Sequence, residues 1–199
     1  MQHTKKIVGE TCYLSPPVLE DAADWTCWLN DLEVAVPLGD EAYEPVTVEG
    51  QEGLLGAAGR GDLHAFALVA LKDDRPLGRC LLFDVNHVDR RGMMGIFLGQ
   101  KEDWDQGLGQ EATRLLLDYA FNLLNLHSVM LGTFSFNERA QRCYRKVGFR
   151  EFGRRREARL LGGRWYDMVF MDMLAPEFRE RYASCLPLPG QGGIGQGRT

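Results

Sequence analysis

The segment GIFLGQKEDWDQGLGQEATRLLLDYAF, residues 95–121, decides the fold. An apolar strand ends at Leu98 or Gly99, a loop leads to the glycine-rich stretch 106–110, and a long helix follows at once. The helix is predicted because apolar residues recur along 109–124 at alternating steps of three and one. Free N–H groups at its start, beside glycines that permit close approach, would suit an anion such as a pyrophosphate. Taken alone, two glycines before a helix are more often an ordinary turn.

The glycine spacing excludes two common phosphate-binding motifs. The chain has no GxxxxGK[ST] sequence, so a nucleoside triphosphate P-loop is excluded. A dinucleotide-binding GxGxxG is disfavoured because position 112 is Ala and the following strand lacks a suitably placed acid for a ribose.

A second motif, SFNERAQRCYRKVGF at 135–149, predicts a helix from Asn137 to Val147 that Gly148 ends. Asn137 and Tyr144 are seven residues apart, which is about two helical turns, so their side chains share one face. Asn137 suits a helix N-cap and Tyr144 an ordinary semi-buried position, and these plain roles remain open. A tyrosine can also donate a phenolic proton, and an asparagine can both donate and accept a hydrogen bond.

The rest of the chain predicts a mixed sheet in one domain. We expect helices over 18–34 and from Thr47 to just before Gly59, and strands at 11–14, 64–72, 77–85, 92–99, 127–134 and on either side of the Gly162–Gly163 turn. The fold class is α/β (α+β), with a mostly antiparallel central sheet of about seven strands and helices on both faces. Strand 92–99 is apolar almost throughout and is expected to be buried on both faces.

Glycine loop, helix, strand and then NxRAxxxYxxxGF, in this order and at these distances, resemble the GNAT acyl-CoA N-acyltransferase superfamily. The resemblance covers about Tyr13 to Leu174 and is strongest over 93–150. Trp104 in W-x-x-G-x-G is similar to the branch of ribosomal-protein N-terminal acetyltransferases and spermidine acetyltransferases. The resemblance implies a GNAT-like fold, acetyl-CoA as co-substrate, and direct acetyl transfer to a primary amine of a polyamine, protein N-terminus, amino sugar or other small molecule.

The resemblance also implies roles for particular residues. The strand Ile96-Phe97-Leu98 would offer backbone groups to the pantetheine arm and the thioester carbonyl, and Gln106, Gly107, Leu108, Gly109 and Gln110 would hold the pyrophosphate. Asn137 would contact the pantetheine, Tyr144 would protonate the departing thiolate, and Ala140 completes the cofactor-binding positions of the motif. Thioester aminolysis needs an oxyanion donor, a held anion and a proton for the sulfur. Arg139, Arg142, Arg145 and Lys146 either meet the 3′-phosphate of CoA or are merely solvated.

The general base is left open, because the strand in which family members often carry a Glu reads Met93-Met94-Gly95. The candidate substitutes are Asp84, His87, Asp31, Glu33, Asp40, Glu41 and Glu44. The missing acid makes a non-catalytic acyl-CoA-binding regulatory module the alternative function. Cys143 adjoins Tyr144 but is expected to face a different side of its helix, so no cysteine is predicted as a nucleophile.

The net charge of −5 is unevenly distributed. Residues 1–100 carry 8 basic and 16 acidic side chains, and residues 101–199 carry 15 and 12; between Ile7 and Gly59 there are 11 acids and no Lys or Arg. We therefore expect CoA against the second half and a cationic amine against the first, with a solvated acidic surface as the plainer alternative. An arginine cluster could indicate RNA, but strand alternation would divide it between two faces, so nucleic acid is not predicted as a partner. Its members are Arg150, Arg154, Arg155, Arg156, Arg159 and Arg164.

Scattered cysteines and histidines complete the predictions. Five widely spaced cysteines and four scattered histidines indicate neither a disulfide framework nor a metal site.

The chain has no signal peptide and no apolar stretch of membrane-spanning length, so we expect a cytoplasmic protein that does not bind membranes. Residues 1–176 are predicted to form one acetyltransferase domain, and 177–199 an extension that ends in a disordered Gly/Pro-rich tail. The sequence does not reveal the oligomeric state, although a homodimer is common among the proteins that it resembles.

Overall fold

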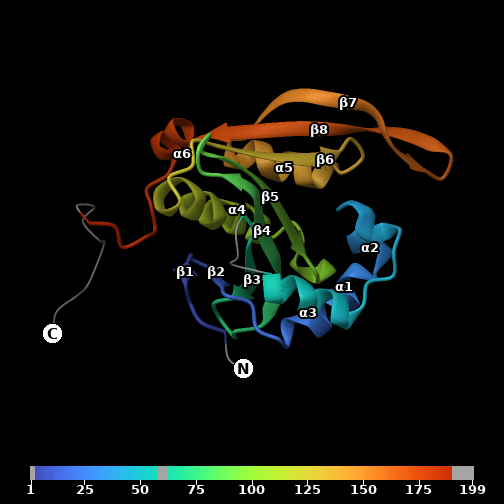
Figure 1. Ribbon diagram of the computed structural model, residues 1–199, viewed down its shortest axis with the longest axis horizontal. Helices are drawn as coiled ribbons and strands as arrows, with labels where there is room; N and C mark the ends of the chain where they lie inside the picture. Colours follow the sequence, from blue (N-terminus) through green and yellow to red (C-terminus); the bar gives the residue numbers. More distant parts are fainter. Residues whose placement is uncertain (1–2, 58–61, 190–199) are drawn as a thin grey trace.

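The structure is a computed structural model that describes residues 3–57 and 62–189. Its centre is an eight-stranded sheet of order β1-β2-β3-β4-β5-β6-β8-β7, in which β5 and β6 are parallel and the other neighbouring pairs antiparallel (Figure 1). The strands are β1 (Ile7–Val8), β2 (Cys12–Ser15), β3 (His64–Ala70), β4 (Pro76–Asn86), β5 (Arg91–Leu98), β6 (Ser128–Phe134), β7 (Arg150–Leu161) and β8 (Arg164–Leu174).

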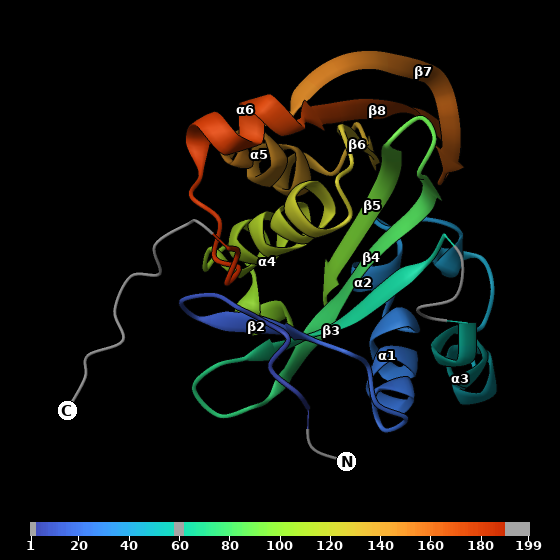
Figure 2. The ribbon, with the colours of Figure 1, turned by 60° about the vertical axis from the view of Figure 1, so that its left-hand side comes forward.

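Helices cover both faces of this sheet, as the second view shows (Figure 2). One face carries α1 (Asp21–Leu29), α2 (Leu32–Ala35) and α3 (Val48–Ala57), and the other carries α4 (Leu108–Asp118), α5 (Glu138–Val147) and α6 (Ala175–Arg181). Single turns span Asp40–Ala42, Lys101–Asp103 and the π-helical Tyr119–Leu123. Each face has its own core: Trp25, Trp28 and Phe97 belong to the first, and Leu116 and Phe178 belong to the second.

All seven predicted strands are present, and the eighth is the two-residue β1, which is too short to leave a periodic pattern. Helix α3 forms despite its three internal glycines. The expectation that strand 92–99 is buried on both faces is wrong. Met93, Ile96 and Leu98 are half-buried, because a cavity replaces part of the packing along β5.

The predicted domain boundary at 176/177 lies within α6. Phe178 of this helix and Leu186 beyond it belong to the main core. Asp118 on α4 accepts hydrogen bonds from the Ser184 hydroxyl and the Cys185 amide, each at 2.7 Å. The segment to Leu186 therefore stabilises the domain, whereas residues 190–199 of the predicted tail lie outside the described residues.

Two further properties concern the described residues alone. None of their helices combines the length and apolar character that a membrane crossing requires. Within the same ranges, no three His, Cys, Asp or Glu side chains come together as a metal site would need.

Candidate active site

The parallel strands β5 and β6 separate part-way along the sheet. They pair at Arg91–Ser128, Gly92–Val129 and Met93–Met130, and neither strand pairs with the other beyond these residues. Backbone groups along the free edges are thereby left available for a ligand. A cavity of about 530 Å³ opens at this gap.

The strand register divides the cavity into two halves. Arg79 on β4 lies opposite Phe97 on β5, and Phe97 belongs to the core beneath α1, so both side chains point to that face. Met94 belongs to the core beneath α4. The α1 half is lined by Val34, Pro37, Leu38, Gly39, Glu41, Arg79, Leu81, Phe83, Met93, Gly95 and Phe97. The α4 half is lined by Met94, Ile96, Leu98, Trp104, Asp105, Gly107, Gly109, Gln110, Asn137, Arg139, Ala140, Arg142, Cys143, Tyr144 and Lys146.

The N-terminus of α4 faces the α4 half. Gly107 is its N-cap, with φ +86°, a left-handed conformation that glycine adopts easily. The amides of Leu108 and Gly109 have no acceptor among the described residues, so they are available to an anion. The side chains of Gln106 and Leu108 do not line the cavity, because that of Gln106 donates to the Glu102 carbonyl and that of Leu108 packs against the core.

Trp104 joins the end of β5 to α5. Its indole N–H donates to the Leu98 carbonyl at 3.1 Å, and the guanidinium carbon of Arg139 lies 3.5 Å from the centroid of its ring. The Leu98 carbonyl is therefore already engaged, while Ile96 and Phe97 line the cavity beside it.

Asn137 is the N-cap of α5, and both ends of its amide contact the protein. Its Oδ1 accepts from the Ala140 amide at 3.1 Å, and its Nδ2 donates to the Pro37 carbonyl at 3.3 Å. Asn137 therefore fixes the loop after α2 against α5, and both Asn137 and Ala140 line the cavity. Gly148 ends the helix in a left-handed conformation, which confirms the predicted C-cap.

Tyr144 lies two helical turns after Asn137 and lines the same cavity. The residue is 8% exposed, and its hydroxyl makes no hydrogen bond with residues 3–57 and 62–189. Burial, with a smaller effect of Cys143, raises the pKa of this phenol well above its ordinary value of 10. The phenol therefore keeps its proton at neutral pH.

Cys143 faces a different side of the helix from Tyr144, yet it also lines the cavity. Consecutive helical residues are only about 100° apart, and the cavity wraps around both. Burial raises the pKa of the Cys143 thiol to about 11, which leaves it protonated and a weak nucleophile at neutral pH.

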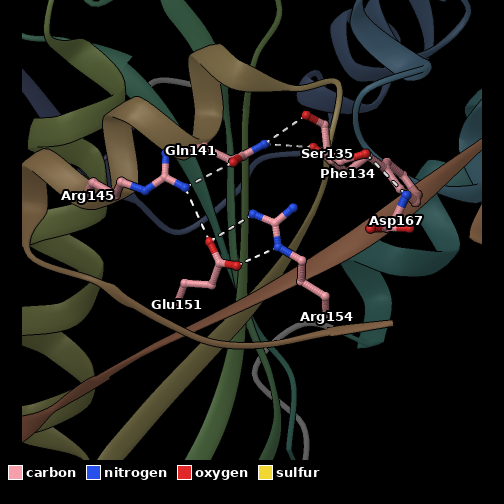
Figure 3. A network of polar contacts seen from close by, with 7 residues as sticks. All are labelled: Phe134, Ser135, Gln141, Arg145, Glu151, Arg154 and Asp167. Atoms are coloured by element: carbon pink, nitrogen blue, oxygen red, sulfur yellow. Dashed lines mark hydrogen bonds and ion pairs between the residues drawn. The ribbon is translucent and has the colours of Figure 1, made fainter. Parts of the chain in front are cut away.

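Three cations of α5 line the α4 half: Arg139, Arg142 and Lys146. They recur at steps of three and four, which places them on one helical face. Arg145, the fourth predicted cation, instead donates to Gln141 at 3.1 Å and to Glu151 at 3.3 Å (Figure 3).

The contacts in Figure 3 also fix the turn that presents Asn137. The Gln141 amide donates to the carbonyls of Phe134 and Ser135 at 3.2 and 3.1 Å. The Ser135 hydroxyl accepts from the Asp167 amide at 3.1 Å. The end of β6, α5 and β8 are thus held together behind the cavity.

The α1 half holds one carboxylate and one guanidinium. The Oε1 atom of Glu41 lies 3.9 Å from a guanidinium nitrogen of Arg79. The Arg79 guanidinium is 5.2 Å from the ring centroids of both Trp25 and Phe97, and it donates to the side chain of Gln51 at 2.9 Å. Burial lowers the pKa of Arg79 to about 10, so it remains cationic at neutral pH.

Among the seven candidate bases, Glu41 alone lines the cavity. Asp31 and Glu33 pair with Lys101, Asp40 with Arg159 and Asp84 with Arg91, and Glu44 and His87 are exposed. Four acids of the first acidic segment thus meet cations from later in the chain: Asp31, Glu33, Asp40 and Glu41. These pairs weaken the negative field that the sequence predicts around the acceptor.

The predicted arginine cluster is divided in the structure. Arg150 pairs with Glu177, Arg154 with Glu151, and Arg159 with Asp40. Arg159 is 3% exposed and donates to the Gly39 carbonyl at 2.7 Å, so it anchors the loop before Asp40.

Among the cavity residues that sequence analysis did not single out are two buried polar side chains, Arg79 and Thr133. Thr133 on β6 is 5% exposed, and its buried hydroxyl has no partner among the described residues. The available signal was a single polar residue in each of two apolar stretches, Arg79 within residues 77–83 and Thr133 within residues 129–134. A buried hydroxyl without a partner is costly, and a bound polar ligand would offset that cost.

Comparison with known proteins agrees with this geometry. Residues 12–150 match the acetyltransferase (GNAT) domain family. A Bacillus subtilis protein described as a probable N-acetyltransferase, YjcK, is 29% identical over 179 residues, covering 85% of this chain and 97% of that relative. Spermidine N(1)-acetyltransferase of Escherichia coli K12 is 31% identical over 119 residues, covering 60% of this chain and 61% of that enzyme. Spermidine N-acetyltransferase of Vibrio cholerae, solved with CoA and spermine, has a TM-score of 0.77 at 22% identity, covering 84% and 98%.

Parallel strands that part at a cavity, with a helix N-terminus on one side of it, suit a transferase that uses an acyl-CoA thioester. The chain belongs to the GNAT acetyltransferase family, whose domain covers most of it. It is an acetyl-CoA-dependent N-acetyltransferase. The residues present fit acetyl-CoA, since the cavity combines free helix amides, three cations and the buried Thr133 hydroxyl, which lacks a partner among the described residues.

Proposed function

We propose that the α4 half binds acetyl-CoA, that the α1 half binds a primary amine, and that the acetyl group passes directly between them at the gap. One observation carries this proposal: the N-terminus of α4, the free edge of β5 and the unpartnered Tyr144 hydroxyl all meet one cavity. The Leu108 and Gly109 amides, with the three cavity cations of α5, would hold the phosphate groups. Thr133 and the edge of β5 would contact the pantetheine arm.

The amine nitrogen attacks the thioester carbonyl carbon, and the bond between that carbon and the sulfur breaks. Glu41 takes the proton that leaves the nitrogen, directly or through one water, and Tyr144 gives its proton to the sulfur. The burial that raises the pKa of Tyr144 acts on the departing sulfur in the same sense, which favours proton transfer between them. Backbone amides at the free edge of β5 stabilise the negative oxygen.

A turnover screen tests this function. Release of free thiol from acetyl-CoA is followed with polyamines, aminoglycosides, amino acids and Ala- or Ser-initiated peptides as acceptors. We expect turnover with at least one amine, and Glu41→Gln should lower kcat by about 100-fold or more. Glu44→Gln is the matched control, because Glu44 is exposed and outside the cavity. Binding of CoA without turnover on any amine would instead support a non-catalytic module.

The proposal extends to the domain boundary and to the cellular compartment. Residues 1–176 would form the catalytic domain, with α6 and the segment after it as a supporting extension. The free cysteines among the described residues suit a cytoplasmic enzyme, because thiols stay reduced there.

A further inference from the structure

Arg79 has more hydrogen-bonding capacity than the protein uses. A guanidinium offers five N–H donors. Among the described residues, Arg79 makes one hydrogen bond, to Gln51, and its Glu41 contact of 3.9 Å is an ion pair too long for a hydrogen bond. Because Arg79 also lines the α1 half, its remaining donors are available to a molecule in that half.

The surroundings of Arg79 hold it in place and bury most of its surface. The rings of Trp25 and Phe97 lie at equal distances from the guanidinium, and the residue is 6% exposed. A desolvated, fixed guanidinium binds a carboxylate strongly, since charge-assisted hydrogen bonds are about twice as strong as neutral ones.

The charges of the α1 half disfavour a polycation. Glu41 is the sole carboxylate among the described residues that line this half, and Arg79 places a positive charge beside it. A polyamine would bring two or more positive charges to one acid and one buried cation. The other walls are apolar and include Leu38, Leu81, Phe83 and Met93.

We infer that the acceptor is a small zwitterionic amine, with a carboxylate next to its amino group and an apolar side chain, and that Arg79 binds the carboxylate. The inference rests on the proposed function, because it names the substrate of the same site. An amino group and a carboxylate on one carbon match the adjacent Glu41 and Arg79. The apolar walls would take the side chain of an amino acid such as leucine, methionine or phenylalanine.

The test compares each of these amino acids with its amide, in which a neutral carboxamide replaces the carboxylate. For the wild-type protein we expect kcat/KM about 10- to 100-fold higher for the acid than for the amide. In Arg79→Gln the ratio should fall toward one, and Arg79→Lys should keep part of it. Thermal unfolding of each variant verifies folding, and the wild-type ratio needs no variant at all.

Each outcome is decisive. Equal turnover of acids and amides, or spermidine as the best acceptor, would overturn the inference and leave the proposed function intact. A preference for acids that Arg79→Gln preserves would also overturn it, since the carboxylate would then bind elsewhere. No thiol release with any amine would count against the proposed function itself.

Discussion

The indole nitrogen of Trp104 donates a hydrogen bond to the carbonyl oxygen of Leu98 at 3.1 Å, so the loop after β5 is tied to the strand that it leaves. The same ring lies against the Arg139 guanidinium. Trp104 therefore contacts both β5, through Leu98, and α5, through Arg139, and holds these two elements together at the edge of the α4 half.

We expect Trp104→Leu to raise KM for acetyl-CoA more than it lowers kcat. The lost hydrogen bond and cation–π contact are together worth about 1–2 kcal/mol, which corresponds to a change of about 5- to 30-fold. Steady-state kinetics with acetyl-CoA as the varied substrate measure the effect. Trp165→Leu is the control, since Trp165 is 56% exposed on β8 and outside the cavity. Equal KM values for the two variants would contradict this role of Trp104.

Gly107→Ala should destabilise the protein by about 1 kcal/mol and also raise KM for acetyl-CoA. An added Cβ meets nothing within 4 Å, so the cost comes from the positive φ and not from a clash. Relaxation of that strain would turn the free amides of α4 away from the cavity. Gly153→Ala is a matched control, because its Cβ also meets nothing within 4 Å and its φ is not in the strained range. Chemical denaturation and kinetics of both variants separate strain from packing.

The elements around the site could be predicted because each leaves a local pattern. The apolar stripe of 109–124, the capping Asn137 and the terminal Gly148 are all encoded within a few residues. Contacts between distant segments leave no such pattern. Nothing in the sequence near Glu41 indicates that it meets Arg79, which is 38 positions away and on a different element. Sequence analysis therefore could not identify the base among the seven candidates.

The same limit applies to the acidic N-terminal half. Its charge is a property of the sequence, but its field depends on which cations fold against it. Lys101 and Arg159 come from segments far along the chain and pair with Asp31 and Asp40. The acidic segment is therefore partly neutralised in the structure, which no count of charges by position could show.

Glu151→Gln should reduce stability at neutral pH and lose this effect in acid. The Arg154 hydrogen bonds, with a smaller effect of Arg145, hold the pKa of Glu151 below its ordinary value of 4.5. The contribution is therefore fully present above that value and disappears as the pH falls through the lower pKa of the folded state. The pair is solvent-exposed, so the difference should be at most about 1 kcal/mol. Urea unfolding of both proteins between pH 7 and about pH 3 measures it, and a difference that does not change with pH would contradict the assignment.

Cys143 should react with a thiol-specific alkylating reagent slowly at neutral pH and faster as the pH rises toward 11. Only the thiolate reacts, and burial raises the pKa of this thiol to about 11. Acetyl-CoA should protect Cys143, because this residue lines the α4 half. Mass spectrometry of peptides follows each cysteine separately, and the exposed Cys27 serves as an internal control that CoA should not protect. Equal protection of both cysteines would indicate a general effect on the reagent.

Tyr144→Phe should lower kcat by about 100-fold or more and leave KM for acetyl-CoA within about threefold, because it removes the proton donor but keeps the ring in the cavity. The raised pKa of Tyr144 adds a second expectation: the wild-type rate should show no loss from phenol ionisation up to about pH 10. Tyr182→Phe is the matched control. The Tyr182 hydroxyl donates to the Val147 carbonyl at 2.9 Å, and Tyr182 does not line the cavity. That variant should lose about 1 kcal/mol of stability with unchanged kcat. A normal rate in Tyr144→Phe would remove Tyr144 from the mechanism and leave the departing thiolate to take its proton from water.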